Sequence, residues 1–264
     1  MRCLLIIAMA LTAAAQPAAQ PSRDQIYGEF RQWVTQQPRD AAGDPFDRYR
    51  AYLLGKGVSA ADADERVRLL REQSKRMEVE LWNRVLTAEK PRFNTNPNAF
   101  LVEMVKGRKP GKALDVGMGQ GRNAIWLAQQ GWDVTGFDPA EKAVALAKQN
   151  AEKAGVKLTT EIKGWEDFDF GENRWDLVVL SYVGAREFNG IVTKALKPGG
   201  VVVLEAFHAD ATKSGSIGGA VVFDSGELPA LFKDLRVVRY EEPMATADFG
   251  QQQLRVVRLC AEKP

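Results

Sequence analysis

The sequence predicts an α/β fold: a seven-stranded, mostly parallel sheet with a terminal antiparallel strand pair, preceded by a helical N-terminal segment. Apolar runs of strand length alternate with helix-periodic stretches from residue 112 onward. Val, Leu and Ile fill these runs with little polar alternation, as expected of parallel strands that are covered on both faces. The last two runs, residues 235–242 and 254–260, are close together in the chain and therefore predict the antiparallel pair.

The N-terminal segment, residues 22–90, is strongly polar and helix-prone, and we expect helices and no strands there. Its longest helix begins after Ser59, has acidic residues in the first turn and runs to about Thr87. Residues 91–97 (PRFNTNP) break the helical pattern, and residues 98–106 resume it as a short helix. The helical segment is therefore expected to end at this break.

The α/β domain follows at residues 91–264. Its strands are expected at residues 113–117, 132–138, 158–163, 175–181 and 200–207, and its helices at residues 122–130, 139–154 and 225–232, with one more helical stretch before the turn at 197–200. An open α/β sheet binds ligands beyond the carboxyl ends of its strands, beside the first strand. The stretch that falls at this point is residues 115–126.

Length and charge limit the possible functions. With 264 residues, of which 45% are hydrophobic, the chain is long enough to bury one sizeable core. Its 36 basic and 34 acidic residues leave a formal charge of +2, so no global positive field attracts nucleic acid or anionic lipid. We therefore expect no nucleic-acid partner.

The first 21 residues are typical of a secretory signal peptide. They combine Arg2, an apolar run too short to span a bilayer comfortably, and small residues at 13–15. This pattern predicts export to the periplasm or the medium, with no stable membrane insertion after signal removal, and a cytoplasmic protein if the signal is not used. Without Cys3 the mature chain keeps only Cys260, which we expect to be a buried, inert thiol in a strand.

The stretch DVGMGQGRNAIW, residues 115–126, predicts a strand end, a glycine turn and a helix start. Its three alternate glycines, Gly117, Gly119 and Gly121, let the backbone approach a ligand closely. A triphosphate loop needs a Lys after its glycines, and none follows at that spacing. A dinucleotide loop has its third Gly where Arg122 stands here. A dinucleotide cofactor is therefore a minor alternative, and a nucleoside without phosphate is favoured.

Together with three later stretches, this turn resembles the class I S-adenosylmethionine-dependent methyltransferases, which have a Rossmann-like fold. Residues 115–121 are similar to the family signature D-x-G-x-G-x-G. The other stretches are GFDPA at residues 136–140, NRWDLVVLSYV at residues 173–183 and LKPGGVVVLEAF at residues 196–207. The resemblance extends through most of the chain after Phe93. It implies transfer of a methyl group by in-line displacement.

The resemblance implies a binding site for S-adenosylmethionine. Asp138 would accept both ribose hydroxyls, and Asp115 would meet the ammonium group of the methionine part. Many relatives bind adenine through an Asp at the position of Gly164, and Trp165 and Glu166 are expected to substitute for it here. The expected cofactor-binding residues are Asp115, Gly117, Gly119, Gly121, Arg122, Asn123, Asp138, Pro139, Trp165, Glu166 and Ser181.

The string GQGRN at residues 119–123 is like that of bacterial methyltransferases that act on small acceptors, including the tellurite and thiol group. Arg122 and Asn123 would open the helix that follows. A contact with the cofactor or the acceptor fits both residues, and so does ordinary hydrogen bonding at a helix start.

Tyr182 and His208 are the candidate catalytic residues. Tyr182 ends the fourth strand beside the expected methyl group, and His208 ends the fifth, where it could act as a base if the acceptor must lose a proton. The SYVG string does not match the N/D-P-P-Y/F string of enzymes that methylate nucleic-acid bases, and no metal-ligand spacing is present. We therefore expect a small-molecule acceptor, with the helical segment and residues 93–94 as its lid.

A non-catalytic protein that binds S-adenosylmethionine or S-adenosylhomocysteine is the alternative, because the acceptor side carries no catalytic signature. Export is also in conflict with catalysis, since the methyl donor is made and kept inside cells.

Overall fold

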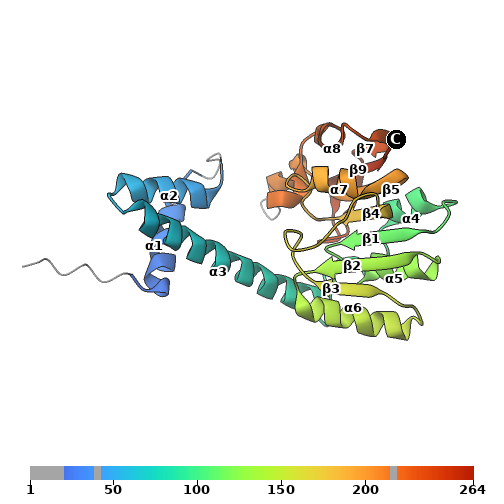
Figure 1. Cartoon of the computed structure of the whole chain (residues 1–264), viewed down its shortest axis with the longest axis horizontal. Helices are drawn as coiled ribbons and strands as arrows, with labels where there is room; N and C mark the ends of the chain where they lie inside the picture. Colours follow the sequence, from blue (N-terminus) through green and yellow to red (C-terminus); the bar gives the residue numbers. More distant parts are fainter. Residues whose placement is uncertain (1–20, 39–42, 215–218) are drawn as a thin grey trace, which may run out of the picture. The chain divides into compact units, whose positions relative to one another are not determined.

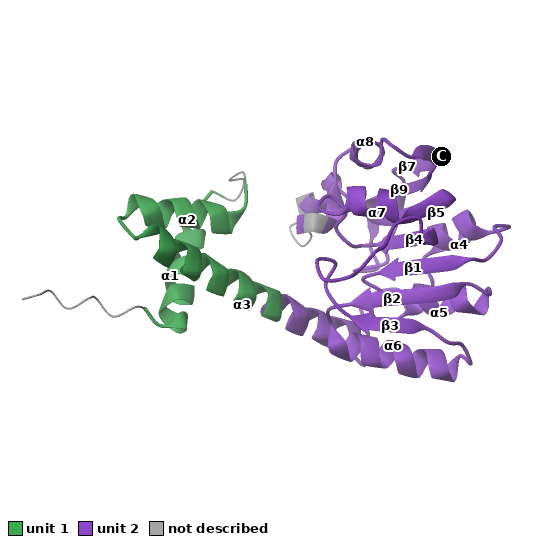
Figure 2. Cartoon of the chain, viewed as in Figure 1, with its two compact units in different colours: residues 1–76 green, residues 77–264 purple. Residues whose placement is uncertain are grey.

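The computed structural model describes residues 21–38, 43–214 and 219–264. The chain forms two compact units, residues 1–76 and 77–264 (Figure 2). The predicted signal peptide lies outside the described residues, apart from Pro21. Of the helices in the described ranges, none is both long and apolar enough to cross a bilayer.

Unit 1 is helical, as the sequence predicts. It contains α1 (Arg23–Thr35), α2 (Pro45–Gly55) and the first part of α3 (Ala60–Leu86). A capping box at Ser22 starts α1, and the Asp44 carboxylate caps α2. The buried core of this unit combines three aromatic and four aliphatic residues and comprises Ile26, Phe30, Trp33, Tyr49, Leu53, Ala63 and Leu70. The unit boundary lies inside α3, whereas the sequence places the domain boundary at the break after residue 90.

Unit 2 contains the predicted sheet (Figure 1). Its seven main strands lie in the order β3-β2-β1-β4-β5-β9-β7, in which β9 is antiparallel to both of its neighbours and the others are parallel. Their bounds are β1 (Lys112–Val116), β2 (Asp133–Asp138), β3 (Thr159–Ile162), β4 (Trp175–Ser181), β5 (Leu196–His208), β7 (Arg236–Glu241) and β9 (Gln253–Glu262). Two short strands extend the sheet, β6 (Val222–Phe223) beside β5 and β8 (Met244–Thr246) beside β9.

Helices cover both faces of this sheet, which explains why its strands are apolar on both sides. Successive residues of β1, such as Ala113 and Leu114, belong to different core clusters. One face packs against α4 (Ala99–Val105) and α5 (Arg122–Gln129), and the other packs against α7 (Asn189–Ala195) and α8 (Glu227–Leu231). The remaining helices are α6 (Glu141–Lys153) and the short 3₁₀ helices Ala209–Ser214 and Gly219–Val221.

Strand β5 starts earlier than the sequence predicts. The residues expected to form a turn before it, 197–200, are already part of the strand. Their backbone pairs with the end of the chain, since the Gly199 amide donates to the Lys263 carbonyl and the Lys263 amide donates to the Gly200 carbonyl. This pairing is not local in sequence, and a Pro-Gly-Gly string gives no sign of it.

Candidate functional site

A cavity of about 400 Å³ opens at the carboxyl ends of β1, β2 and β4. This volume is within the range of roughly 300–1,000 Å³ that is typical of small-molecule sites. The position is the one expected for ligands of an open α/β sheet. Its walls are mainly apolar and aromatic, and they comprise Glu78, Trp82, Leu86, Val116, Gly117, Phe137, Asp138, Pro139, Trp165, Ser181, Tyr182, Val183, Gly184, Glu187, Phe188, Val221 and Phe249.

The glycine turn has backbone angles that only glycine adopts easily. Gly117, Gly119 and Gly121 have φ values of +63°, +55° and +82°. A Cβ atom on Gly117 would lie 2.5 Å from Cγ1 of Val183, so a side chain there would collide with the cavity wall. Of the three glycines, Gly117 lines the cavity, and Gly121 is the N-cap residue of α5. The turn therefore brings bare backbone against the cavity.

Asp138 ends β2 at the cavity wall and is nearly completely buried. Its two carboxylate oxygens accept one backbone N–H each, from Gly119 at 2.9 Å and from Ala140 at 2.8 Å. Burial raises the pKa of this carboxyl, and the two amide donors partly offset the effect. Each oxygen keeps a further lone pair. The side chain is thus held in one orientation and retains the capacity to accept hydroxyl groups.

Asp115 lies beneath the glycine turn, not among the residues that line the cavity. Its Oδ2 accepts the N–H of Ala124 at 3.1 Å, in the first turn of α5. Burial raises the pKa of Asp115 to about 7, although nearby Arg122 favours the charged form. The contact with the ammonium group of a cofactor stays a prediction.

Arg122 and Asn123 both make hydrogen bonds within the protein. The Arg122 guanidinium donates to the Asn96 carbonyl at 3.0 Å and to Ser181 Oγ at 2.9 Å, and it pairs with Asp248 at 2.8 Å. The Asn123 side chain accepts the backbone N–H of Asn98 at 2.9 Å. Ser181 lines the cavity and Arg122 does not, so Arg122 acts on the cavity through its hydrogen bond to the Ser181 side chain.

Tyr182 has an unusual backbone for a bulky residue, with φ at +57°. Its hydroxyl donates to Glu205 Oε1 at 2.9 Å and accepts the N–H of Asp248 at 3.1 Å. Burial and the neighbouring Glu205 carboxylate raise the pKa of this hydroxyl. Tyr182 therefore lines the cavity with its ring, while its hydroxyl is used to join three segments of the chain.

A buried polar network behind Tyr182 was not predicted from the sequence. Glu205 and Asp248 are the acceptors at its centre, and both are almost completely buried. The Asn98 amide donates to both carboxylates at 2.8 Å, Arg258 donates to Glu205 at 2.6 Å, and Asn94 donates to Asp248 at 2.8 Å. Two arginines, counting Arg122, balance the two carboxylates. The network joins β4, β5, α5, the segment before α4 and the loop before β9.

His208 ends β5 as predicted but does not line the cavity. Its Nδ1 accepts the N–H of Asp210 at 3.0 Å, and its Nε2 lies 2.9 Å from Ser225 Oγ. Ser225 in turn donates to Glu242 at 2.9 Å. The imidazole is therefore connected to the segment after β6 and, through Ser225, to Glu242 directly after β7, and the structure does not bring it together with Tyr182 at the cavity.

Trp165 and Glu166 follow Gly164, where the sequence predicts a substitute for the missing Asp, and their role in adenine binding stays a prediction. Trp165 lines the cavity and stands beside Phe188, with ring centroids 5.3 Å apart. The Glu166 carboxylate folds back over Gly164, so that a Cβ atom on Gly164 would lie 2.7 Å from Glu166 Oε2. An acidic group thus occupies the space next to position 164 despite the glycine there.

The end of α3 adds a wall that the sequence identifies only as a charged helix. Trp82 and Leu86 face the cavity, and Phe249 lies against them from the loop before β9. Phe249 is 5.9 Å from Trp82, 5.3 Å from Phe93 and 5.4 Å from Tyr182 between ring centroids. These four aromatic rings come from separate parts of the chain.

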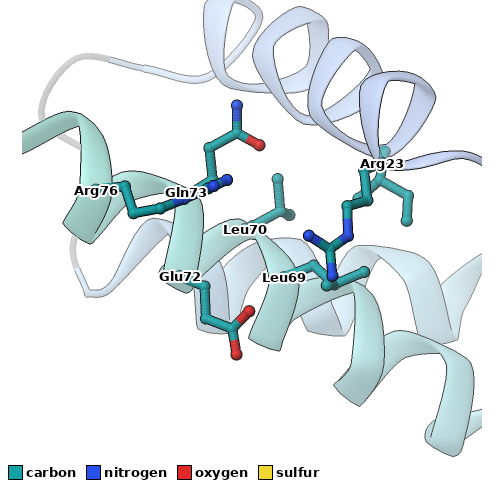
Figure 3. A pocket seen from close by; sticks show the side chains of 7 residues that line it. Arg23, Leu69, Leu70, Glu72, Gln73 and Arg76 are labelled. Atoms are coloured by element: carbon teal, nitrogen blue, oxygen red, sulfur yellow. The ribbon is translucent and has the colours of Figure 1, made fainter.

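The hollow in unit 1 is less suitable as a ligand site. Unit 1 has a hollow of about 10 Å³ lined by Arg23, Ile26, Leu69, Leu70, Glu72, Gln73 and Arg76 (Figure 3). Such a volume holds about one water molecule, which is too small for a ligand. Within the described ranges, no group of three or more His, Cys, Asp or Glu side chains could hold a metal ion.

Comparison with known proteins gives a family and a fold. Residues 90–257 match the family described as tellurite resistance protein TehB. A probable S-adenosyl-L-methionine-dependent methyltransferase TehB from Haemophilus influenzae is 28% identical over 161 residues, which are 58% of this chain and 56% of that protein. A ubiquinone biosynthesis O-methyltransferase from Paramagnetospirillum magneticum is 40% identical over 93 residues, or 33% of this chain and 37% of that one. The chain thus spans about half or less of the length of these relatives.

Two solved structures share the fold. The crystal structure of TehB from Haemophilus influenzae superposes with a TM-score of 0.52 at 22% identity, covering 63% of this chain and 62% of that chain. The N-methyltransferase NodS from Bradyrhizobium japonicum, in complex with S-adenosyl-l-homocysteine, gives a TM-score of 0.55 at 18% identity, covering 70% of this chain and 98% of that chain. At this identity the likeness is evidence for the fold alone.

Proposed function

This chain belongs to the TehB family, and on that premise we propose that it transfers a methyl group from S-adenosylmethionine to a small-molecule acceptor. The observation that carries the proposal is the cavity at the ends of β1, β2 and β4, with bare Gly117 backbone and the Asp138 carboxylate in its wall. The relatives whose names include S-adenosylmethionine or a methyltransferase activity support it.

The residues present fit this cofactor. A Cβ atom on Gly117 would fill the space beside Val183, which is consistent with a ligand that needs close approach to the backbone. Asp138 can accept the ribose hydroxyls with its remaining lone pairs, and Trp165 offers an aromatic face for adenine. Glu166 lines a neighbouring hollow and is not among the residues that line this cavity, so its contact with the adenine amino group stays a prediction.

Positioning accounts for the proposed chemistry. When bound, S-adenosylmethionine supplies an activated methyl group on a sulfonium. The protein has to hold the acceptor atom in line, about 3–3.5 Å from the methyl carbon. The rigid network behind Ser181 and Tyr182 suits this task, because it fixes the end of β4. The Tyr182 hydroxyl is already in use and His208 lies outside the cavity lining, so we assign proton transfer to neither residue.

The test is methyl transfer from isotopically labelled S-adenosylmethionine to a panel of thiols, phenols and amines, next to calorimetric measurement of cofactor binding. We expect binding and transfer to at least one class. The Asp138→Ala variant should lose at least tenfold in cofactor affinity, while Asp133→Ala, at the exposed start of the same strand, should not change it. Tight binding without transfer to any acceptor would favour the non-catalytic binder, and no binding would overturn both.

Export by residues 1–21 is a separate proposal, supported only by the sequence pattern. Cell fractionation followed by N-terminal sequencing of the recovered protein tests it. A chain that begins near residue 20 in the exported fraction supports export, whereas an intact N-terminus in the cytosol contradicts it and leaves the proposed chemistry unchanged.

A further inference from the structure

We infer that the acceptor is an apolar or aromatic molecule without negative charge, and that Phe249, Glu78 and Glu187 determine this preference. The inference rests on the proposed function, since it concerns the acceptor part of the same cavity.

The acceptor part of the cavity can be located from the sheet order. Apart from Ser181 at the end of β4, the expected cofactor residues lie at or after the ends of β1, β2 and β3, which are together on one side of the sheet. The other walls come from the end of β4 and beyond it and from α3. Most of their side chains are apolar or aromatic, and they comprise Tyr182, Val183, Gly184, Phe188, Val221 and Phe249, with Trp82 and Leu86 of α3; Ser181, Glu187 and Glu78 are the polar members. An acceptor that meets the cofactor at the end of β4 therefore contacts these side chains.

The acceptor walls are apolar and aromatic. Phe249 is in the middle of them, because it contacts Trp82 edge to face and lies near the ring of Tyr182. The two hydroxyls at the end of β4 are both in use: that of Tyr182 is directed to Glu205 and Asp248, and Ser181 Oγ accepts from Arg122. Such a surface favours a flat apolar body and can also attract a cationic group through the ring faces.

The charged groups that line the cavity are all acidic. They are Glu78, Asp138 and Glu187, and no Lys or Arg is among the described lining residues. Glu78 and Glu187 are exposed, and neither has an ion-pair partner within the described part of the chain. Arg122 is the cation behind Ser181, but its charge is balanced by Asp248 at 2.8 Å. An anionic acceptor would meet unbalanced negative charge and find no basic group to bind.

The expected effect of Glu78 and Glu187 on acceptor affinity is small for each residue, because both carboxylates are exposed to solvent. Coulomb interaction at several ångströms in a water-like medium is worth only about a threefold change in affinity for each exposed carboxylate. Two such groups therefore separate a cation from an otherwise similar anion by more than tenfold at low salt. The difference should shrink at 0.5 M salt, because exposed charges are screened.

The experiment uses three probes with the same ring: benzyltrimethylammonium, benzyl alcohol and phenylacetate. Each is titrated into the full chain saturated with S-adenosylhomocysteine, and the dissociation constants are measured by ligand-observed NMR. We expect the cation to bind at least as tightly as the alcohol, and phenylacetate to bind more than tenfold more weakly than the cation at low salt. Equal binding of the three, tighter binding of phenylacetate, or no binding of any probe overturns the inference.

Variants separate the two parts of the argument. The double substitution Glu78→Gln and Glu187→Gln should reduce the ratio between cation and anion to about threefold or less, while Glu152→Gln, on the exposed face of α6, should leave it unchanged. Phe249→Ala should weaken all three probes about fivefold, and Phe249→Leu should restore most of the loss. A ratio that is unchanged in the double variant contradicts the role of the two glutamates.

The failure of this inference is distinguishable from failure of the proposed function. S-adenosylhomocysteine binding is measured first, in the absence of probes. If it binds and the probes show no order by charge, the acceptor assignment fails and the proposed methyl transfer stands.

Discussion

The two halves of the cavity differ in how the chain builds them. The cofactor half, which we propose to hold S-adenosylmethionine, uses backbone and one carboxylate from contiguous strand–turn–helix units, as at Gly117 and Asp138. The acceptor half is assembled from α3, the end of β4 and the loop before β9, and a buried polar network connects those last two segments. Local sequence therefore specifies the first half, whereas only the tertiary fold specifies the second.

Removal of the Asp248 carboxylate should have the largest effect. Arg122 has a side chain only 8% exposed and would lose its charged partner, and Asn94 and Asn98 would each lose an acceptor. We expect Asp248→Ala to lower the free energy of unfolding by about 3 kcal/mol, measured by urea denaturation. Asp133→Ala is the control and should stay within about 0.5 kcal/mol. An Asp248→Ala protein as stable as the wild type would show that the network does not hold the acceptor half together.

The pH dependence of stability tests the cofactor half. Asp115 has a pKa of about 7 in the folded chain against 3.8 as the ordinary value. Between pH 5 and pH 7 the folded state therefore keeps a proton that the unfolded state has lost, and stability falls as pH rises. We expect a loss of about 2 kcal/mol across this window relative to Asp115→Asn, from denaturation curves at each pH. If the stability of the wild type and of Asp115→Asn changed with pH in the same way, the raised pKa of Asp115 would be contradicted.

Substitution of Gly117 should affect the cofactor more than the fold. Gly117→Ala forces a side chain into positive φ and places its Cβ 2.5 Å from Val183, so we expect about a tenfold loss in affinity for S-adenosylhomocysteine by calorimetry. Adding Val183→Ala should recover part of it. Gly155→Ala has the same backbone strain, with φ at +69° and no neighbour within 4 Å, and should leave affinity unchanged. Equal losses in the two Gly→Ala variants would mean that strain alone is responsible.

The smallest effect is expected for Tyr182→Phe. The change leaves Glu205 and the Asp248 N–H with one hydrogen bond fewer, which costs about 1 kcal/mol of stability. Methyl transfer should fall by no more than about threefold with an unchanged pH profile. A loss of a hundredfold or more would instead identify the hydroxyl as an acid or base.

The sequence predicts the parts of this protein whose signal is local. The parallel strands, the glycine turn and Asp138 at the end of β2 all follow from short motifs and their spacing, and the structure has them at the expected places. Cys260 is buried in β9, as expected of an inert thiol. These features are indicated by short stretches of the sequence.

The parts that the sequence missed depend on distant partners. In the sequence, Glu205 is one residue of an apolar strand. Its role in the buried network depends on hydrogen bonds from Asn98, Tyr182 and Arg258. The sequence likewise does not distinguish Asp248 from other loop carboxylates, because its ion pair with Arg122 forms only in the folded chain. One signal was present, because a charged residue in the middle of a run such as VVVLEAF must be paired when both faces of the sheet are covered.

The burial of Cys260 also bears on how turnover can be counted. A thiolate is a good methyl acceptor, so a reactive cysteine near the cavity would compete with the external acceptor for the donor. Cys260 lies inside the sheet between β5 and β7, and burial raises the pKa of its thiol, which keeps it protonated and out of reach. No methyl group that leaves the donor should therefore be retained on Cys260.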